Sequence, residues 1–453
     1  MSALIDELAA KARIWFVQLL RFDTSNPPGN ERALIEYLAH ILSVEGIPCQ
    51  LVARDAARPN LVAEVKGSDP SRAPLLLSSH VDVVPVVGAA LWRHPPFAGV
   101  ESEGAIWGRG ALDVKYKTCF DVAALIAARR MGVARTLKLV ALVDEEEGGA
   151  NGSAYLTKSH RELIDAEYVI NEVGGFNVQI GGRQFVPLQA GEKSSATLQV
   201  VVKGVSGHGS LPHPRNSILW LSQLVASLTQ DFDGFCVSAT SRHFFTELAQ
   251  ACASPERELL STLLDKERFR QTLRSLPDQN LAVQLGAMLA HTITPTSLKA
   301  GTSRNVIPEE ASAAFDCRIV PDLSCEQFSD KIGKFLCRRA DELGAKVEYE
   351  LKTLSTGYEI PQGDALLQQI STCIERFWAE ALEKPKVLSM LMPAASDNSF
   401  YFAAGIKPIG FAPLLFPDGF EGFALAHNRD ERLPLAAFEA GARCYLETIA
   451  DLM

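Results

Sequence analysis

Residues 75–86, LLLSSHVDVVPV, form an apolar, β-rich run that ends in His-x-Asp. Such a run predicts a buried strand, with His80 at its end and Asp82 two positions further on. A carboxylate at that spacing can orient the imidazole as a metal ligand. The stretch therefore predicts a strand that presents a metal-ligating histidine at its carboxyl end.

The same pattern, an apolar run followed by acidic residues, recurs along the first part of the chain. LKLVALV (137–143) leads into DEEEGG, which contains Glu145 and Glu146, and EYVI (167–170) leads into NEVGG, which contains Glu172. Loops at the carboxyl ends of strands in an open α/β sheet converge on one crevice, so residues far apart in sequence meet there. We therefore expect a single site.

Two further segments complete the set of ligand types. Asp113 lies in WGRGALDVK (107–115) and His427 lies in AHNRDERLPL (426–435). Two divalent ions need a bridging carboxylate with further imidazole and carboxylate ligands, a mixture that suits zinc, cobalt or manganese. A carboxylate that is not a ligand must also move the water proton, and spacing alone leaves open which glutamate of DEEE does so. The set predicts a binuclear metallohydrolase.

Plainer readings exist for some of these residues. His427 has an alternative as a surface residue before a helix, with Asp430 and Glu431 in the first turn of that helix. His208, between two glycines, has an alternative as a simple turn residue. GRGALD superficially resembles a dinucleotide-binding loop, but it lacks the third glycine, so we reject that reading.

Composition narrows the class of protein. The chain has 453 residues, 47% of them hydrophobic, which is enough for two domains. Its 44 basic residues against 54 acidic ones give a net charge of −10, without a basic cluster, so nucleic acid is not an expected partner. No apolar run approaches the roughly 18 residues that span a bilayer. Nine cysteines without a C-x-x-C pair indicate reduced thiols, and we expect a cytoplasmic protein that does not bind membranes.

The order of elements predicts two domains. Strand-like and helical runs alternate up to about residue 192, which predicts a doubly wound, mainly parallel α/β sheet. From 193 the pattern becomes β-α-β-α-β, with room for another strand at LKAGTSRNV, which predicts an inserted α+β domain of the split-βαβ, ferredoxin-like kind. We assign 1–192 and 357–453 to a metal-binding catalytic domain and 193–356 to the insertion.

With these motifs the chain resembles the M20 family of metallopeptidases. That family includes aminoacylases, acetylornithine deacetylase, succinyl-diaminopimelate desuccinylase, glutamate carboxypeptidases and cytosolic dipeptidases. The resemblance runs nearly end to end, through DTSNPPGNE (23–31), H-x-D, W-GRG-x-x-D-x-K, DEE-x-GG, NEVGG, GHGS-x-P, RNVIP (304–308), D-x-R and H-x-x-D-E-R. Each motif is weak alone, and the ordered series is specific.

The resemblance implies two divalent metal ions per chain, with zinc first and cobalt or manganese as alternatives. His80 and Glu172 would hold one ion, Glu146 and His427 would hold the other, and Asp113 would bridge both.

The resemblance also implies the remaining roles. Glu145 would be the general acid/base and Asp82 the partner of His80. His208 of the insertion would reach the active site of the other subunit of a homodimer and stabilise the tetrahedral oxyanion. The insertion would then be a lid and dimerisation domain.

Two departures from the family pattern concern the substrate. Tyr116 stands where the family commonly has glycine, and Ser399 stands where aminoacylase-like members have an arginine that binds the substrate carboxylate. Loss of a bidentate arginine puts recognition of a free carboxylate in doubt, unless Arg304, Arg318 or Lys193 substitutes for it. The candidate substrate-binding residues are Asn305, Arg318, Ser399 and Tyr116.

These observations predict hydrolysis of an amide bond in a small N-acyl amino acid or related amide, by metal-activated water with a glutamate base. An exopeptidase of the carboxypeptidase or dipeptidase kind, acting on short peptides, is the alternative among enzymes. A catalytically idle binding protein on the same scaffold is the alternative from another class. The intact Glu145 and the complete ligand set argue against it.

Overall fold

A computed structural model describes every residue of the chain except 384 and 421. The chain divides into two compact units. Unit 1 comprises Met1–Ala190, Ile360–Met390 and Ser396–Met453, and unit 2 comprises Gly191–Glu359 and Leu391–Ala395. The chain leaves unit 1 after Ala190 and returns at Ile360, whose amide donates to the Ala190 carbonyl oxygen at 2.7 Å.

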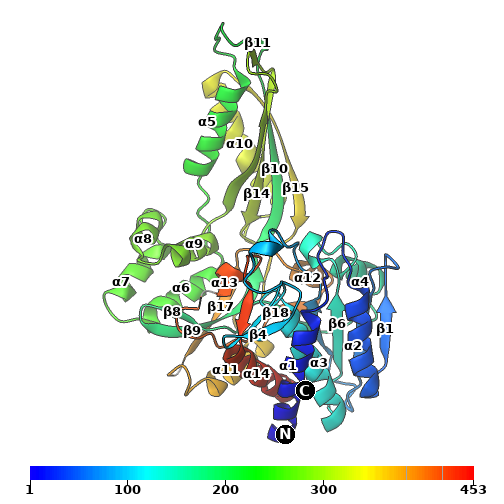
Figure 1. The fold of residues 1–453 in the computed structure, drawn as a ribbon. Coiled ribbons are helices and arrows are strands. Elements are labelled where there is room, and N and C mark those ends of the chain that lie inside the picture. The colour runs from blue at the N-terminus through cyan, green and yellow to red at the C-terminus, as the bar shows by residue number, and fades with distance from the viewer. Residues whose placement is uncertain (384, 421) are drawn as a thin grey trace. The chain divides into compact units, whose positions relative to one another are not determined.

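Unit 1 is built around four parallel strands (Figure 1). In spatial order these are β6 (Leu137–Leu142), β3 (Leu75–His80), β7 (Tyr168–Asn171) and β18 (Lys407–Gly410). β3, β6 and β7 are buried along their whole length, as expected of central parallel strands that read as continuous apolar runs. This confirms the predicted mainly parallel central sheet.

Antiparallel strands extend this sheet on both sides. β2 (Asn60–Val65) and then β1 (Cys49–Val52) follow β6, and β9 (Arg183–Glu192) follows β18. The sheet is completed by three short or irregular strands, namely β8 (Val178–Ile180), β16 (Tyr358–Glu359) and β17 (Lys386–Met392). The sequence pattern does not predict β9 or β17.

Helices cover both faces of the sheet in unit 1. α3 (Lys115–Met131) packs on β3 and β6, and α1 (Ser2–Leu19) and α14 (Leu435–Leu452) pack on α3 (Figure 1). On the other face, Leu156 of α4 (Ser153–Ser159) and Tyr401 of α12 (Asn398–Ala403) pack against Leu76, Val140 and Val169 of the sheet. Further helices of the unit are α2 (Arg32–Val44) and α11 (Ala365–Phe377). The doubly wound layering is therefore confirmed.

A separate three-stranded sheet in unit 1 joins distant parts of the chain. β4 (Val100–Ser102) pairs with β5 (Ala105–Trp107), and β5 pairs antiparallel with β19 (Arg432–Pro434). The short helix α13 (Gly422–Leu425) lies shortly before β19. This pairing brings the segment before β19 next to the segment after β5.

Unit 2 has the ferredoxin-like topology that the sequence predicts. Its elements in chain order are β10 (Ser194–Lys203), α5 (Ser217–Gln230), β12 (Thr292–Ala300), β14 (Glu310–Ile319), α10 (Cys325–Leu343) and β15 (Lys346–Ser355). All neighbours in the sheet, ordered β12-β14-β10-β15, are antiparallel. Figure 1 shows α5 and α10 on the same side of this sheet. Phe328 and Ile332 of α10 and Leu221 of α5 pack with alternate residues of β10 and β14.

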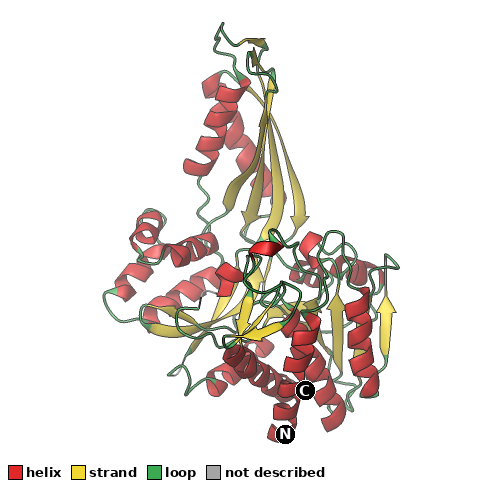
Figure 2. Cartoon of the chain, in the orientation of Figure 1, coloured by secondary structure: helices red, strands yellow, loops and turns green. Residues whose placement is uncertain are grey.

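Two details of unit 2 differ from the sequence reading or add to it. The extra strand, β12, ends at Ala300, so most of it lies before the predicted LKAGTSRNV. Between α5 and β12 the chain forms a group of helices (Figure 2). These are α6 (Ala239–Ala251), α7 (Glu256–Ser261), α8 (Phe269–Ser275) and α9 (Gln279–Met288).

Among the described residues, every helix is too short or too polar to cross a bilayer. The nine cysteines are all free in the structure.

Candidate active site

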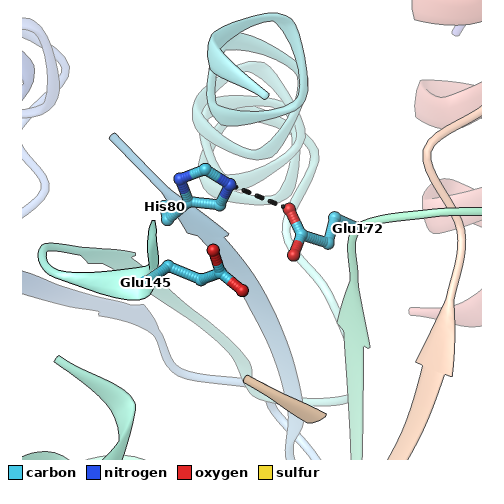
Figure 3. A group of neighbouring side chains, drawn as sticks. All are labelled: His80, Glu145 and Glu172. Carbon is cyan, nitrogen blue, oxygen red and sulfur yellow. Dashed lines mark ion pairs between the residues drawn. The ribbon is translucent and has the colours of Figure 1, made fainter. Parts of the chain in front are cut away.

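The carboxyl ends of three adjacent parallel strands bring the candidate residues together. His80 is the last residue of β3, Glu172 directly follows β7, and the DEEE segment follows β6. The Nε2 atom of His80 lies 3.0 Å from Oε2 of Glu172 and 3.1 Å from Oδ1 of Asp113, which lies just before α3. Figure 3 shows the carboxylates of Glu145 and Glu172 directed into the same space beside the His80 ring. The strand ends thus converge as expected.

Asp113 stands between two imidazoles. Its Oδ1 lies 3.1 Å from Nε2 of His80, and its Oδ2 lies 2.9 Å from Nε2 of His427. The same His427 nitrogen lies 3.3 Å from Oε1 of Glu146. One carboxylate therefore presents a different oxygen to each histidine, which is the arrangement of a bridging ligand between two groups.

The two histidines differ in their surroundings. The His80 side chain is 1% exposed and that of His427 is 48% exposed. The alternative reading of His427 as a residue before a helix that starts at Asp430 or Glu431 is wrong. Glu431 is fully buried, the chain then forms β19, and α14 begins only at Leu435.

The histidines and carboxylates of the site shift one another's pKa values. Hydrogen bonds to Asp113 and then Glu146 raise the pKa of His427 to about 10. Burial alone would lower the pKa of His80, but Glu172 and Asp113 raise it well above its usual value. Burial would raise the pKa of Asp113, and its hydrogen bonds with the two histidines lower it instead. The surrounding carboxylates therefore favour positive charge at both imidazoles, as the ligands of a cation site do.

Asp82 holds two parts of the site at once. Its Oδ1 accepts from the backbone amide of Glu145 and its Oδ2 from that of Glu146, each at 3.1 Å. Oδ1 also lies 3.5 Å from Nδ1 of His80. Burial alone would raise the pKa of Asp82, but the hydrogen bonds from His80 and Asn26 lower it. Asp82 thus fixes the turn that carries the two glutamates through its carboxylate, and it fixes His80 through its carbonyl oxygen, which lies 3.0 Å from Nδ1.

Glu145 lies at the start of a short 3-10 turn, Glu145–Glu147. Burial, followed by the charge of Glu172, raises the pKa of Glu145 well above its usual range. Glu147 is exposed, whereas Glu145 and Glu146 are partly buried. A carboxyl group whose pKa is raised in this way is suited to accept and return a proton.

A buried polar network that sequence reasoning missed supports this turn. Asp144, just before Glu145, has a left-handed backbone with φ of 72°. Its Oδ1 accepts from Arg58 at 2.8 Å and from Asn26 at 3.1 Å, and its Oδ2 accepts from Asn151 at 2.9 Å. Sequence offers one signal for it, because Asp144 begins the DEEE segment that follows the apolar run LKLVALV.

In unit 2, two sequence motifs that lie far apart in the chain meet in a small two-stranded sheet. β11 (Gly207–His208) pairs with β13 (Val306–Ile307), and the Gly209 amide donates to the Asn305 carbonyl oxygen at 2.7 Å. The Ser210 amide donates to Nδ1 of His208 at 3.2 Å. In neutral His208 the proton must then be on Nε2, and the exposed ring presents an N–H donor.

Arg318 lies away from that two-stranded sheet within unit 2. It is near the end of β14, whose first residue, Glu310, pairs with the end of β10 that leads to His208. The eight steps from Glu310 to Arg318 span about 26 Å at about 3.3 Å per residue. Its guanidinium makes two hydrogen bonds to Asp316, at 2.7 and 3.0 Å. His208 and Asn305 therefore lie beyond the end of β14 that begins at Glu310, and Arg318 lies near its other end.

The two departures from the family pattern lie in unit 1. Tyr116 is buried in α3, and its hydroxyl donates to the Ala412 carbonyl oxygen at 3.1 Å, so only its ring remains for a substrate. Ser399, in α12, is 4% exposed and donates to the Ser396 carbonyl oxygen at 3.2 Å. Next to it, Asp397 accepts from Ser153, and burial raises its pKa to about 7.

The donor set fits divalent cations. Ligand atoms of His80, Glu145 and Glu172 lie within 4.8 Å of one another, as do those of His80, Asp113 and Glu146. Buried carboxylates at this density are costly without a neighbouring cation. Imidazole nitrogens mixed with carboxylate oxygens are the ligands of zinc, manganese and cobalt rather than of magnesium or copper(I).

Comparison with known families and relatives agrees with this chemistry. The family described as "Peptidase family M20/M25/M40" matches residues 76–451. Aminoacylase-1 of Sus scrofa is 27% identical over 450 residues, which cover 96% of this chain and 94% of that protein.

Solved structures with the same fold include two enzymes. One is an M20 family metallo-carboxypeptidase, Sso-CP2 from Sulfolobus solfataricus, with a TM-score of 0.68 and 18% identity, covering 96% of this chain and 97% of that one. The other is human carnosine dipeptidase 1, with a TM-score of 0.65 and 15% identity, covering 100% of this chain and 99% of that one. At these identities the likeness is one of fold.

Proposed function

Because this chain belongs to peptidase family M20/M25/M40 and is a metal-dependent amidohydrolase or peptidase, we propose that it hydrolyses the amide bond of a small N-acyl amino acid with two metal ions. The observation that carries the proposal is Asp113, which presents one oxygen to His80 and the other to His427. The ion at His80 would be held also by Glu172, and the ion at His427 also by Glu146. The similarity to aminoacylase-1 supports the acyl amino acid as substrate.

Different residues of the chain carry out different parts of the proposed reaction. Bound here, divalent ions supply a polarised scissile carbonyl and a water whose pKa falls toward about 7. Glu145 accepts the proton of the attacking water and returns it to the leaving nitrogen, for which its raised pKa is suited. Asp82 orients His80 and, through two backbone amides, the turn of Glu145. His208 supplies an N–H donor for the oxyanion from the partner subunit of a homodimer.

Metal content is the direct test. We expect the purified protein, after reconstitution with zinc or cobalt, to contain two ions per chain by elemental analysis, and a chelator to abolish amide hydrolysis. Activity should return on adding metal back. A reconstituted protein with one ion or none would contradict the binuclear proposal.

His208→Ala should lower kcat by roughly 10²- to 10³-fold and leave two ions bound, because the histidine contacts the developing oxyanion and is not a ligand. The control is His213→Ala, a nearby histidine outside the proposed machinery. If the histidine acts across a dimer, mixing inactive His208→Ala with inactive Glu145→Gln should restore part of the activity. No recovery, with subunit exchange demonstrated by mass spectrometry, would contradict action across the dimer.

Recognition of the substrate carboxylate should be weak. Of the replacements for the absent arginine, Arg318 is paired with Asp316, and Lys193 donates to the carbonyl oxygens of Ala287 and Ala290 at 2.9 and 2.8 Å. Arg304 is exposed. A charge-assisted bond from arginine contributes about 1.5 to 3 kcal/mol, so a site without it discriminates less.

We therefore expect the kcat/KM of an N-acyl amino acid to exceed that of its carboxamide by less than roughly 100-fold, or about 2.7 kcal/mol. Ser399→Arg should increase this ratio, and Ser399→Met, which adds bulk without charge, should not. A wild-type ratio above 100-fold would contradict the proposal. Short peptides in the same assay test the alternative of a carboxypeptidase or dipeptidase.

We also propose a cytoplasmic setting, to which the nine free cysteines are suited.

A further inference from the structure

A buried ion pair joins two loops of the candidate site that lie far apart in the sequence. Nη1 of Arg109 donates to Oε2 of Glu431 at 2.5 Å, across 322 positions of the chain. Both residues are buried, with exposed fractions of 3% and 0%. β5 and β19 lead to them, since Trp107 pairs with Arg432 and the Gly108 amide donates to the Glu431 carbonyl oxygen at 3.0 Å.

The carboxylate of Glu431 fills the glycine-rich turn GRGALD. It accepts from the backbone amides of Leu112 at 2.7 Å, Gly110 at 3.2 Å and Asp113 at 3.3 Å. Convergent backbone amides of this kind form an anion-binding nest. The turn that superficially resembles a dinucleotide loop does hold an anion, and that anion is a side chain of the same protein. Glu431 thereby fixes the backbone of the bridging aspartate.

The guanidinium of Arg109 fixes the other loop. Nη2 donates to the carbonyl oxygen of His427 and Nη1 to that of Asn428, each at 3.2 Å. The guanidinium carbon lies 5.2 Å from the centre of the Trp92 ring, which covers it. His427 itself is half exposed, and it lies on a loop rather than at the end of a strand. Its position therefore depends on these backbone contacts more than the position of His80 does.

We propose that Arg109 and Glu431 are positioning residues that set the separation of Asp113 from His427 and so the affinity of the metal ion held by His427. The pair acts on this ion from both sides, through the amide of Asp113 and the carbonyl of His427. Of the ligands of the ion at His80, the pair positions only Asp113. The other two, His80 and Glu172, are positioned independently by β3 and β7. This inference rests on the proposed binuclear function.

The test is a titration of metal-free protein with cobalt(II). Binding is monitored by the absorption spectrum of the bound cobalt and by competition with a chelator. Glu431→Gln keeps the size but turns an NH₂ toward amides that need an acceptor. Arg109→Lys keeps the charge but loses the planar fork that reaches two carbonyls. We expect each variant to bind one of the two ions at least 10-fold more weakly, because partners of metal ligands typically contribute 10- to 100-fold in affinity.

The matched control is Arg135→Lys, which replaces another buried arginine of unit 1 whose Nε donates to the Ala73 carbonyl oxygen at 2.6 Å. This variant should bind both ions as the wild type does. The free-metal concentration that gives half-maximal activity should be higher in the Arg109 and Glu431 variants than in the wild type. Their kcat at saturating metal should stay within about 3-fold of the wild-type value. A general loss of packing would instead weaken both ions alike and lower kcat at saturation.

Wild-type affinity for both ions in both variants would overturn the inference, and so would equal weakening of the two ions. If Glu431→Gln does not fold, as judged by circular dichroism, Arg109→Lys decides the question alone. A wild-type protein that binds fewer than two ions would instead contradict the proposed function.

Discussion

Glu145→Gln is expected to lower kcat by roughly 100-fold or more, about 2.7 kcal/mol in the activation barrier, while both metal ions stay bound. Glutamine keeps the size of the side chain and cannot accept the proton of the attacking water. Glu145 is partly buried among carboxylates that raise its pKa, so no exposed group takes over its proton transfer easily. Single-turnover kinetics with an N-acyl amino acid, together with elemental analysis, measure both quantities.

The neighbour Glu147 provides the matched control, because it has the same chemistry in the same turn and is exposed. Glu147→Gln should retain wild-type kcat. An active Glu145→Gln variant beside an inactive Glu147→Gln variant would show that the register assigned to DEEE is wrong.

Asp113→Ala should have the other large effect, a loss of kcat/KM of roughly 1,000-fold or more, about 4 kcal/mol, with both ions weakened together. The reason is that each of its two oxygens faces a different histidine. Glu146→Ala serves as the comparison, since Glu146 pairs with His427 at 3.3 Å and should weaken one ion. Metal titration of both variants separates the two cases. Loss of a single ion in Asp113→Ala would contradict a bridging role.

Much of the candidate site could be predicted from sequence because its strands are buried on both faces. Such strands read as continuous apolar runs, and the residues just after them, His80, Glu145 and Glu172, must then lie at the same edge of the sheet. His427 follows no predicted strand, and only its resemblance to a family motif pointed to it.

The residues that hold the ligands in place could not be predicted in the same way. Arg109 and Glu431 carry charges, and charged residues are usually exposed, so nothing in the local pattern marks them as buried partners. Their pairing depends on β5 meeting β19, a contact between distant segments. β9 was missed for a related reason, because Pro187 and polar residues interrupt its apolar pattern.

The place of β18 in the sheet of unit 1 has a consequence for synthesis of the chain on the ribosome. β18 forms one side of β7, yet it is made only after the whole of Gly191–Glu359 has emerged. At 5 to 20 residues per second, the 220 residues between Ala190 and Gly410 take on the order of 10 to 40 s. During that time the continuous segment Gly191–Glu359 of unit 2 can fold, while β7 lacks its neighbour β18. The nascent chain is therefore most exposed to aggregation, and most dependent on chaperones, in the interval before β18 is added.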